Sequence, residues 1–155
     1  MSRVRVVVTG VGCISPLGNN VDTTWQGILA GKSGVGRITH FDPTSFKTRF
    51  AAEVKGFDAE SHLGRRDARR MDRFTQFAVV AVGEALSDSG LEIDDGNRGR
   101  VGVILGTGIG GLGTLLKGAE ALAERGPHWV SPFLIPMMLP DTGAGQVAIH
   151  FGLRG

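Results

Sequence analysis

Two apolar runs rich in β-branched residues dominate the hydrophobic pattern, at residues 3–10 and 100–105. Each run carries neighbouring valine, isoleucine or leucine residues and leads into a glycine. Continuous apolar runs of this length are typical of strands that are covered on both faces. A weaker run at 50–54 predicts a further strand. We therefore expect three strands, two of them buried in a sheet.

Four segments place apolar residues at the three- and four-residue steps of an amphipathic helix. They span residues 22–31, 67–89, 113–125 and 141–152. Strands that alternate with helices predict an α/β layered fold with a largely parallel sheet. No repeat, low-complexity tract or linker rich in proline or serine divides the chain, so we expect one domain over residues 1–155.

The end signals and faces of these helices are also defined by the sequence. Asp22 is the expected N-cap of the first helix, in which Trp25, Ile28 and Leu29 share one face. The longest helix is expected to run unbroken from Asp67 to Ser89, with Gly90 as its stop. Its apolar stripe consists of Met71, Phe74, Ala78, Ala81 and Ala85. Valines outside the stripe predict that this helix is covered on more than one side.

Composition argues against nucleic-acid binding, membrane insertion and an internal disulfide. The charged fraction is 21% and the net charge is +2, which is too balanced for a general nucleic-acid binder. No window approaches the roughly 18 uninterrupted apolar residues that a membrane-spanning helix needs. A single cysteine, Cys13, excludes an internal disulfide, and the chain does not start with a secretory leader pattern. We therefore expect a cytoplasmic protein without nucleic acid or membrane as partner.

The segment ILGTGIGGLG, residues 104–113, contains the spacing Gly106-x-Gly108-x-x-Gly111 of a dinucleotide-binding loop. Such a loop needs a second strand that ends in an acidic residue, which binds the ribose. Residues 126–136 carry two prolines and no acidic residue, so this βαβ unit is missing. A Walker loop is excluded because no Gly-Lys-Ser/Thr ends the glycine run. The structural alternative is a tight turn that lets a strand and a helix pack closely.

Arginines gather at the start of the longest predicted helix. The group consists of Arg65, Arg66, Arg69, Arg70 and Arg73. Their spacing places several guanidinium groups on one exposed side, and Asp67 and Asp72 neutralise part of the charge. From the residues alone, the group is either a solvated helix face or a patch that attracts an acidic partner.

Five segments, in this order, resemble the N-terminal portion of an elongating β-ketoacyl-[acyl-carrier-protein] synthase, and together they cover the whole chain. They are RVVVTGVGCISPLGNN, GKSGVGRITHFD, RRDARRMDRFTQFAVVAVGEALSDSGL, VGVILGTGIGGLG and SPFLIPMMLPDTGAGQVAIHFGLRG. The resemblance implies most of the first half of a thiolase-like α/β fold, with helices layered around a mixed, largely parallel sheet, and a homodimer. It implies decarboxylative condensation of acyl and malonyl groups in fatty-acid elongation. Both groups are carried on the phosphopantetheine of acyl carrier protein, with no further cofactor and no metal.

The resemblance also assigns an acyl tunnel. Gly108, Ile109 and Leu112 match positions that line the tunnel in relatives, and Ile109 matches a movable gate. Leu134 and Ile135 match residues that close the far end of the partner subunit's tunnel. On the residues alone, the alternative for Ile109 and for the apolar segment around Leu134 is ordinary core.

The arginine group gains a role from the same resemblance. Arg66, Arg69 and Arg70 match the positions with which relatives grip the acidic carrier protein. Relatives often carry further basic residues just after a Gly-Gly-Pro turn. Here Pro127 is followed by His128 and Trp129, so the second half of the docking patch departs from the pattern.

No residue of this chain matches a catalytic position. In relatives the nucleophilic cysteine follows a few residues beyond the FGLRG motif, and two catalytic histidines lie further on. Cys13 lies in a turn where relatives carry small or apolar residues, and the histidines match neither catalytic segment. They are His40, His62, His128 and His150. The chain is therefore expected to be inactive alone, either as a fragment or as a natural truncation.

Two alternatives to a condensing enzyme remain open on the sequence. One is a non-catalytic partner subunit of the same fold, of the chain-length-factor type, which pairs with a true synthase in a polyketide system. The other is a nucleotide-binding module built on the glycine loop.

Overall fold

Helices dominate the computed structural model, which describes residues 4–155. The α-helices are α1 (Val21–Leu29), α2 (Ala59–Ala68), α3 (Arg73–Ser89), α4 (Leu112–Arg125), α5 (Leu134–Met138) and α6 (Thr142–Phe151). Two short strands are β1 (Val35–Arg37) and β2 (Phe50–Ala52). Single 3-10 turns are η1 (Arg98–Arg100) and η2 (Pro127–Trp129).

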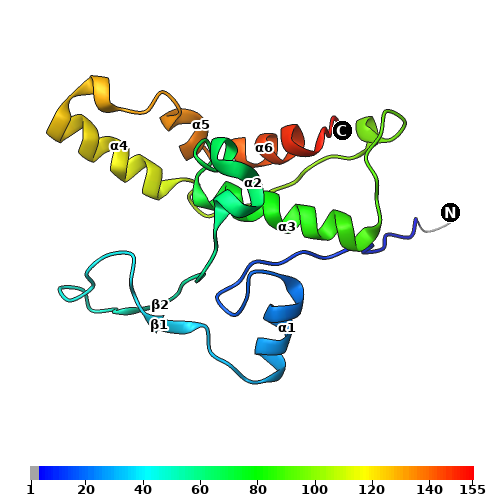
Figure 1. The fold of residues 1–155 in the computed structure, drawn as a ribbon, viewed down its shortest axis with the longest axis horizontal. Coiled ribbons are helices and arrows are strands. Elements are labelled where there is room, and N and C mark those ends of the chain that lie inside the picture. The colour runs from blue at the N-terminus through cyan, green and yellow to red at the C-terminus, as the bar shows by residue number, and fades with distance from the viewer. Residues whose placement is uncertain (1–3) are drawn as a thin grey trace.

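The helices α3 and α6 pack side by side at the centre of the molecule, and α2 packs against α3 (Figure 1). In that view α4 and α5 extend to one end, while α1 and the β1–β2 pair lie on the other side of α3. The hydrophobic core is small and sits between α3 and α6. It is built on Met71, Val79 and Val147, which are all buried.

The two predicted buried strands are not formed among the described residues. Arg3 lies outside them, and Val4, Val6 and Val8 expose 90%, 91% and 83% of their surface. Ile104 in the second run is fully exposed. The only sheet within residues 4–155 is the antiparallel β1–β2 pair, whose second strand confirms the weaker prediction at 50–54.

A strand is held in place by hydrogen bonds to an extended neighbour, and these two runs lack one. Residues 101–105 have one backbone hydrogen bond to another segment of the described chain, from the Gly155 N–H to the Val101 carbonyl at 3.1 Å, while the Val103 side chain packs against the core. The runs at 3–10 and 100–105 therefore have the composition of buried strands but lack, among the described residues, a neighbouring strand to pair with.

The prediction of one unbroken helix from Asp67 to Ser89 is wrong, because α2 and α3 are separate. Asp72 has an extended backbone conformation, and its carboxylate accepts a hydrogen bond from the Phe74 N–H at 3.3 Å, which caps α3. The Gln76 side-chain amide donates to the Ala68 and Met71 carbonyls at 2.8 and 3.1 Å. Carbonyls that a continuous helix would pair are thereby satisfied across the break.

Other helix ends agree with the sequence to different degrees. Gly90 ends α3 in the left-handed conformation, as predicted, and Gly152 ends α6 in the same way. The N-cap of α1 is Asn20, whose side chain accepts from the Thr23 N–H at 2.8 Å, so the assignment to Asp22 is wrong. Helix α4 confirms the prediction for 113–125, whereas α5 was not predicted.

The N-terminal segment lies directly against α3. A Cβ on Gly12 would stand 1.8 Å from the Ala81 carbonyl oxygen, so only glycine permits this approach. The Glu84 carboxylate accepts from the Cys13 and Val21 N–H groups at 2.9 and 2.8 Å. These contacts fix the start of α1 on α3.

The chain exposes much more surface than a compact domain of its size. Its accessible surface is 10956 Å², whereas a compact monomer of 16.3 kDa is expected to expose about 7,500 Å². The excess includes large apolar side chains of the unpaired runs. One small core therefore does not enclose the apolar residues of this sequence.

Candidate functional site

The glycine loop, residues 106–111, joins the unpaired run 101–105 to α4. Gly110 has a φ of 80°, and a Cβ there would stand 2.6 Å from the Met138 carbonyl oxygen. A Cβ on Gly111 would stand 2.5 Å from the Met137 carbonyl oxygen, and the Gly111 N–H donates to the Met138 carbonyl at 3.0 Å. These two glycines therefore let the loop pack on the end of α5.

The first half of the same loop is open. Cβ atoms on Gly106 and Gly108 would meet nothing within 4 Å. Ile109 is 65% exposed and Leu112 is also exposed, so neither is core in this structure. The structure brings the three predicted tunnel residues Gly108, Ile109 and Leu112 to one loop and helix start, where the Ile109 and Leu112 side chains are exposed.

The other two predicted tunnel residues begin α5, which packs on α4. Leu134 is half-buried, and its Cδ1 lies 2.7 Å from the place of a Cβ on Gly118. Ile135 is exposed. Leu134 thus packs α5 against α4, whereas the Ile135 side chain lies on the surface.

Asp72 lies where α3, α4 and the glycine loop meet. One carboxylate oxygen caps α3, and the other accepts a hydrogen bond from the Thr114 hydroxyl in the first turn of α4 at 2.5 Å. Helix α4 has no side-chain cap at Gly111. A carboxylate near a helix N-terminus is favourable because the unpaired N–H groups there carry partial positive charge.

This placement of Asp72 disfavours the nucleotide alternative. A pyrophosphate bound by a glycine loop rests on the N-terminus of the helix that follows. Here an anionic side chain already lies there, and the Gly111 N–H is bonded to Met138. The sequence contained one signal for Asp72, an aspartate just before an apolar helical run, but nothing in it predicted the contact with Thr114.

The predicted docking arginines lie on α2 and on the turn that follows it. Arg66 and Arg69 are exposed, and the Arg69 Nε is 3.8 Å from a Glu60 carboxylate oxygen. The Arg70 guanidinium lies over the Phe133 ring, 5.0 Å from its centroid. Arg73 is also exposed; its guanidinium lies over the Phe77 ring, 4.8 Å from the centroid, and donates to the Val54 carbonyl at 3.1 Å.

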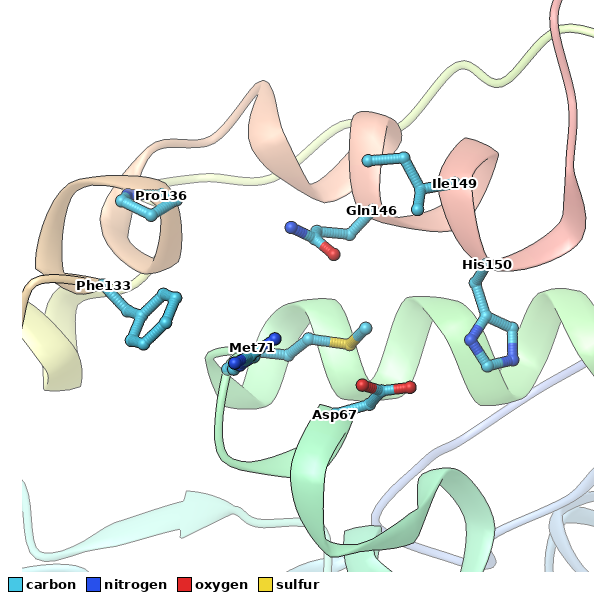
Figure 2. Close-up of a pocket in the computed structure, with 8 residues that line it drawn as sticks. Asp67, Met71, Phe133, Pro136, Gln146, Ile149 and His150 are labelled. Atoms are coloured by element: carbon cyan, nitrogen blue, oxygen red, sulfur yellow. The ribbon is translucent and has the colours of Figure 1, made fainter.

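Arg70 also lines a cavity of about 690 Å³ that the sequence did not predict (Figure 2). Its walls come from the α2–α3 turn, from the region of α5 and from α6. The lining residues are Asp67, Arg70, Met71, Phe133, Pro136, Gln146, Ile149 and His150. Figure 2 shows the Gln146 side chain directed from α6 toward Met71, with Phe133 to one side. The cavity combines apolar walls with a few charged groups.

The cavity beside Cys13 is apolar, while the Glu84 carboxylate accepts a hydrogen bond from the Cys13 N–H on its backbone side. Cys13 is half-buried beside a cavity of about 330 Å³. That cavity is lined by Gly12, Cys13, Ile14, Phe74, Phe77, Ala78, Ala81 and Leu105, with no histidine among them. A nucleophilic thiol needs a base or a positive charge beside it, and this cavity supplies neither.

Two further properties concern residues 4–155 only. No helix among them is long and apolar enough to cross a membrane. No three histidine, cysteine or acidic side chains in this part of the chain gather closely enough to hold a metal ion.

Relatives were found both by sequence and by structure. The family described as "Beta-ketoacyl synthase, N-terminal domain" matches residues 3–155. Over 155 residues the chain is 51% identical to 3-oxoacyl-[acyl-carrier-protein] synthase 2 of Vibrio cholerae serotype O1, covering 100% of the chain and 37% of the relative. Over 153 residues it is 45% identical to the protein of that name from Staphylococcus aureus, covering 99% of the chain and 37% of the relative.

Solved structures of similar fold include two that contain ketosynthases. The ishigamide ketosynthase/chain length factor has a TM-score of 0.82 and 30% identity, over 98% of this chain and 38% of that one. A type II polyketide ketosynthase in complex with its acyl carrier protein has a TM-score of 0.76 and 27% identity, over 98% of this chain and 40% of that one. These similarities confirm the expected thiolase-like α/β class. The chain belongs to the β-ketoacyl synthase family and corresponds to its N-terminal domain.

Proposed function

We propose that this chain is the N-terminal part of a 3-oxoacyl-[acyl-carrier-protein] synthase of fatty-acid elongation. The observation that carries the proposal is the 51% identity over all 155 residues with the Vibrio cholerae synthase. In the proposed reaction a cysteine thiolate attacks the acyl-carrier thioester and takes its acyl group, and the carrier's pantetheine thiol leaves. A malonyl thioester then loses carbon dioxide, and the resulting carbanion attacks the acyl carbonyl. The thiolate leaves, and the chain is two carbons longer.

The nucleophile and the two histidines of this reaction belong, in our proposal, to the part of the synthase outside this chain. Condensation needs an activated thiolate and donors aimed at the developing oxyanion. The apolar cavity beside Cys13 offers neither. The 155 residues would then contribute the tunnel loop and the docking surface, and would form no product alone.

The acyl chain lies, in this proposal, against Gly108, Ile109 and Leu112. The space around Gly108 and the exposed side chains of Ile109 and Leu112 support this role, because an alkyl chain would cover apolar surface that is otherwise in water. In a cytoplasmic homodimer, Ile135 would reach the partner subunit's tunnel. Leu134, which packs on Gly118, would hold α5 in place for it.

Acyl carrier protein is the proposed partner. A ketosynthase of similar fold has been solved in complex with its own acyl carrier protein. Arg66 is exposed on α2, and the exposed Arg69 and Arg70 follow at its C-terminal end. An exposed cationic patch speeds the encounter with an acidic protein.

A second candidate is a non-catalytic partner subunit, because one similar solved structure, 30% identical over 98% of this chain, is a ketosynthase/chain length factor. The two candidates differ in what the complete protein does by itself. A synthase converts acyl- and malonyl-carrier protein into a β-ketoacyl product unaided, whereas a partner subunit forms product only after a second ketosynthase is added. Mass spectrometry of the carrier-bound product separates them. Product formed only in the mixture would replace our proposal with the second candidate.

A further inference from the structure

Within the glycine loop, residues 106–111, only the far end is tightly packed, although Leu105 just before the loop is half-buried beside Phe74. At its far end, Gly111 is buried, and the place of its Cβ lies 3.1 Å from the Asp72 Cγ and 2.5 Å from the Met137 carbonyl oxygen. At its near end, Gly106 and Gly108 have open space around them, and Ile109 is 65% exposed. The position of Ile109 therefore depends on how firmly the loop is held between Gly111 and the first turn of α4.

Asp72 supplies the side-chain hydrogen bond at that anchor. Its carboxylate accepts from the Thr114 hydroxyl in the first turn of α4, and the two residues are 42 positions apart in the sequence. No side chain caps α4 at Gly111, so the Asp72 carboxylate is the charge that stabilises this helix start. A hydrogen bond to an ionised group is shorter and stronger than a neutral one.

Asp72 is itself held rigidly. Its other oxygen caps α3, and its neighbour Met71 is 6% exposed in the core between α3 and α6. The Gln76 side-chain amide donates to the Ala68 and Met71 carbonyls and so holds the turn between α2 and α3. The core thereby fixes Asp72, and Asp72 fixes Thr114.

We propose that Asp72 is a positioning residue that, through Thr114, sets the place of Ile109 and with it the range of acyl chain lengths that the synthase accepts. The inference rests on the proposed function, since it takes Ile109 as a tunnel residue. Loss of the Asp72–Thr114 hydrogen bond loosens the start of α4 and the loop before it. Long acyl chains, which must pass Ile109, are then affected more than short ones.

Two variants of the complete synthase test this. Thr114→Val removes the hydroxyl at nearly constant shape and leaves Asp72 able to cap α3, and Thr114→Ser is the matched control that keeps the hydroxyl. The measurements are the ratio of kcat/KM for long and short acyl-carrier donors, and hydrogen exchange at the Gly111 N–H. For Thr114→Val we expect the ratio to change by about fivefold or more and exchange to be faster. Thr114→Ser should behave as the unaltered protein does.

The outcomes separate this inference from the proposed function. If Thr114→Val keeps both the ratio and the slow exchange, Asp72 does not position the loop and the inference is overturned. If exchange is faster and the ratio is unchanged, the loop is not part of the tunnel, which overturns the tunnel assignment and the chain-length role with it. If Thr114→Val and Thr114→Ser lose activity equally with all donors, the cause is a general loss of structure at this position, and the inference that Asp72 sets the chain length is overturned.

Discussion

Ile109 is the residue on which the tunnel assignment depends most. In the complete synthase, Ile109→Phe should reduce kcat/KM for long acyl donors, because the larger ring occupies the path beside Gly108. Overpacking of this kind costs about 1–3 kcal/mol, and short donors should be spared. Since Ile109 is 65% exposed here, the change has no core to disturb. Ile109→Leu, which keeps the volume, is the control, and unchanged kinetics with long donors for Ile109→Phe would show that Ile109 does not meet the acyl chain.

Arg66 gives the cleaner test of docking, because Arg70 also stacks on Phe133. Arg66→Glu should raise KM for the carrier-protein donor and flatten its dependence on salt, which screens such attraction over about 8 Å at physiological ionic strength. A small acyl-pantetheine donor, which needs no docking, should react as before. Lys32→Glu makes the same charge change on another exposed residue and should have little effect. Equal losses with both donors would mean that Arg66 supports the fold instead.

At the scale of elements, the N-terminal segment packs so closely on α3 that the contact has no room for a side chain at Gly12. Gly12→Ala should lower the free energy of unfolding by about 1–3 kcal/mol, because its Cβ would stand 1.8 Å from the Ala81 carbonyl oxygen. Gly99→Ala is the matched control, since a Cβ there meets nothing within 4 Å. Urea unfolding measures both. Equal stability of the two variants would contradict the packing of this segment on α3.

The β1–β2 pair carries a pH-dependent contact. The Thr39 hydroxyl and N–H donate to the Glu53 carboxylate at 2.7 and 3.0 Å, and these bonds hold the pKa of Glu53 below its ordinary value of 4.5. Because the folded pKa is lowered, the stabilisation is complete above pH 4.5 and is lost as the pH falls through the folded pKa. Thr39→Val should return the Glu53 titration toward 4.5 in an NMR experiment. An unchanged titration would show that the Thr39 hydroxyl does not bind the carboxylate, since the backbone N–H is kept in this variant.

The sequence predicted elements where local signals decide them. Gly90 and Gly152 end helices because glycine adopts the left-handed conformation without strain, and this can be recognised from a few residues. The break at Asp72 escaped prediction because the apolar stripe continues across it and outweighs the one local signal, an aspartate before an apolar run. The Gln76 bonds that close the break arise only from the folded arrangement. The runs at 3–10 and 100–105 have strand composition, but pairing depends on distant segments.

The candidate site was predictable only in part, for a related reason. Gly108, Ile109 and Leu112 were assigned by resemblance, and the structure gathers them because they are neighbours in sequence. The Asp72–Thr114 contact joins residues 42 positions apart, so no local pattern shows it. The same holds for the cavity beside Arg70, whose walls come from three separate parts of the chain.

At the scale of the whole molecule, the exposed surface is the informative quantity. The chain exposes 10956 Å², against about 7,500 Å² for a compact monomer of its mass. It also spans 37% of the length of its Vibrio cholerae relative. In our proposal the remainder of the synthase and the second subunit cover the valine-rich runs, and strand pairing between them completes the sheet.

The central claim, that this chain is the N-terminal part of a condensing synthase, is tested most directly by a chimera. Residues 1–155 replace the segment of the Vibrio cholerae synthase with which they align at 51% identity. We expect the chimera to convert acyl- and malonyl-carrier protein into β-ketoacyl product within about tenfold of the relative's rate, and the 155-residue chain alone to form none. A chimera that unfolds at the relative's own temperature and yet forms no product would contradict the account, as would product formed by the chain alone.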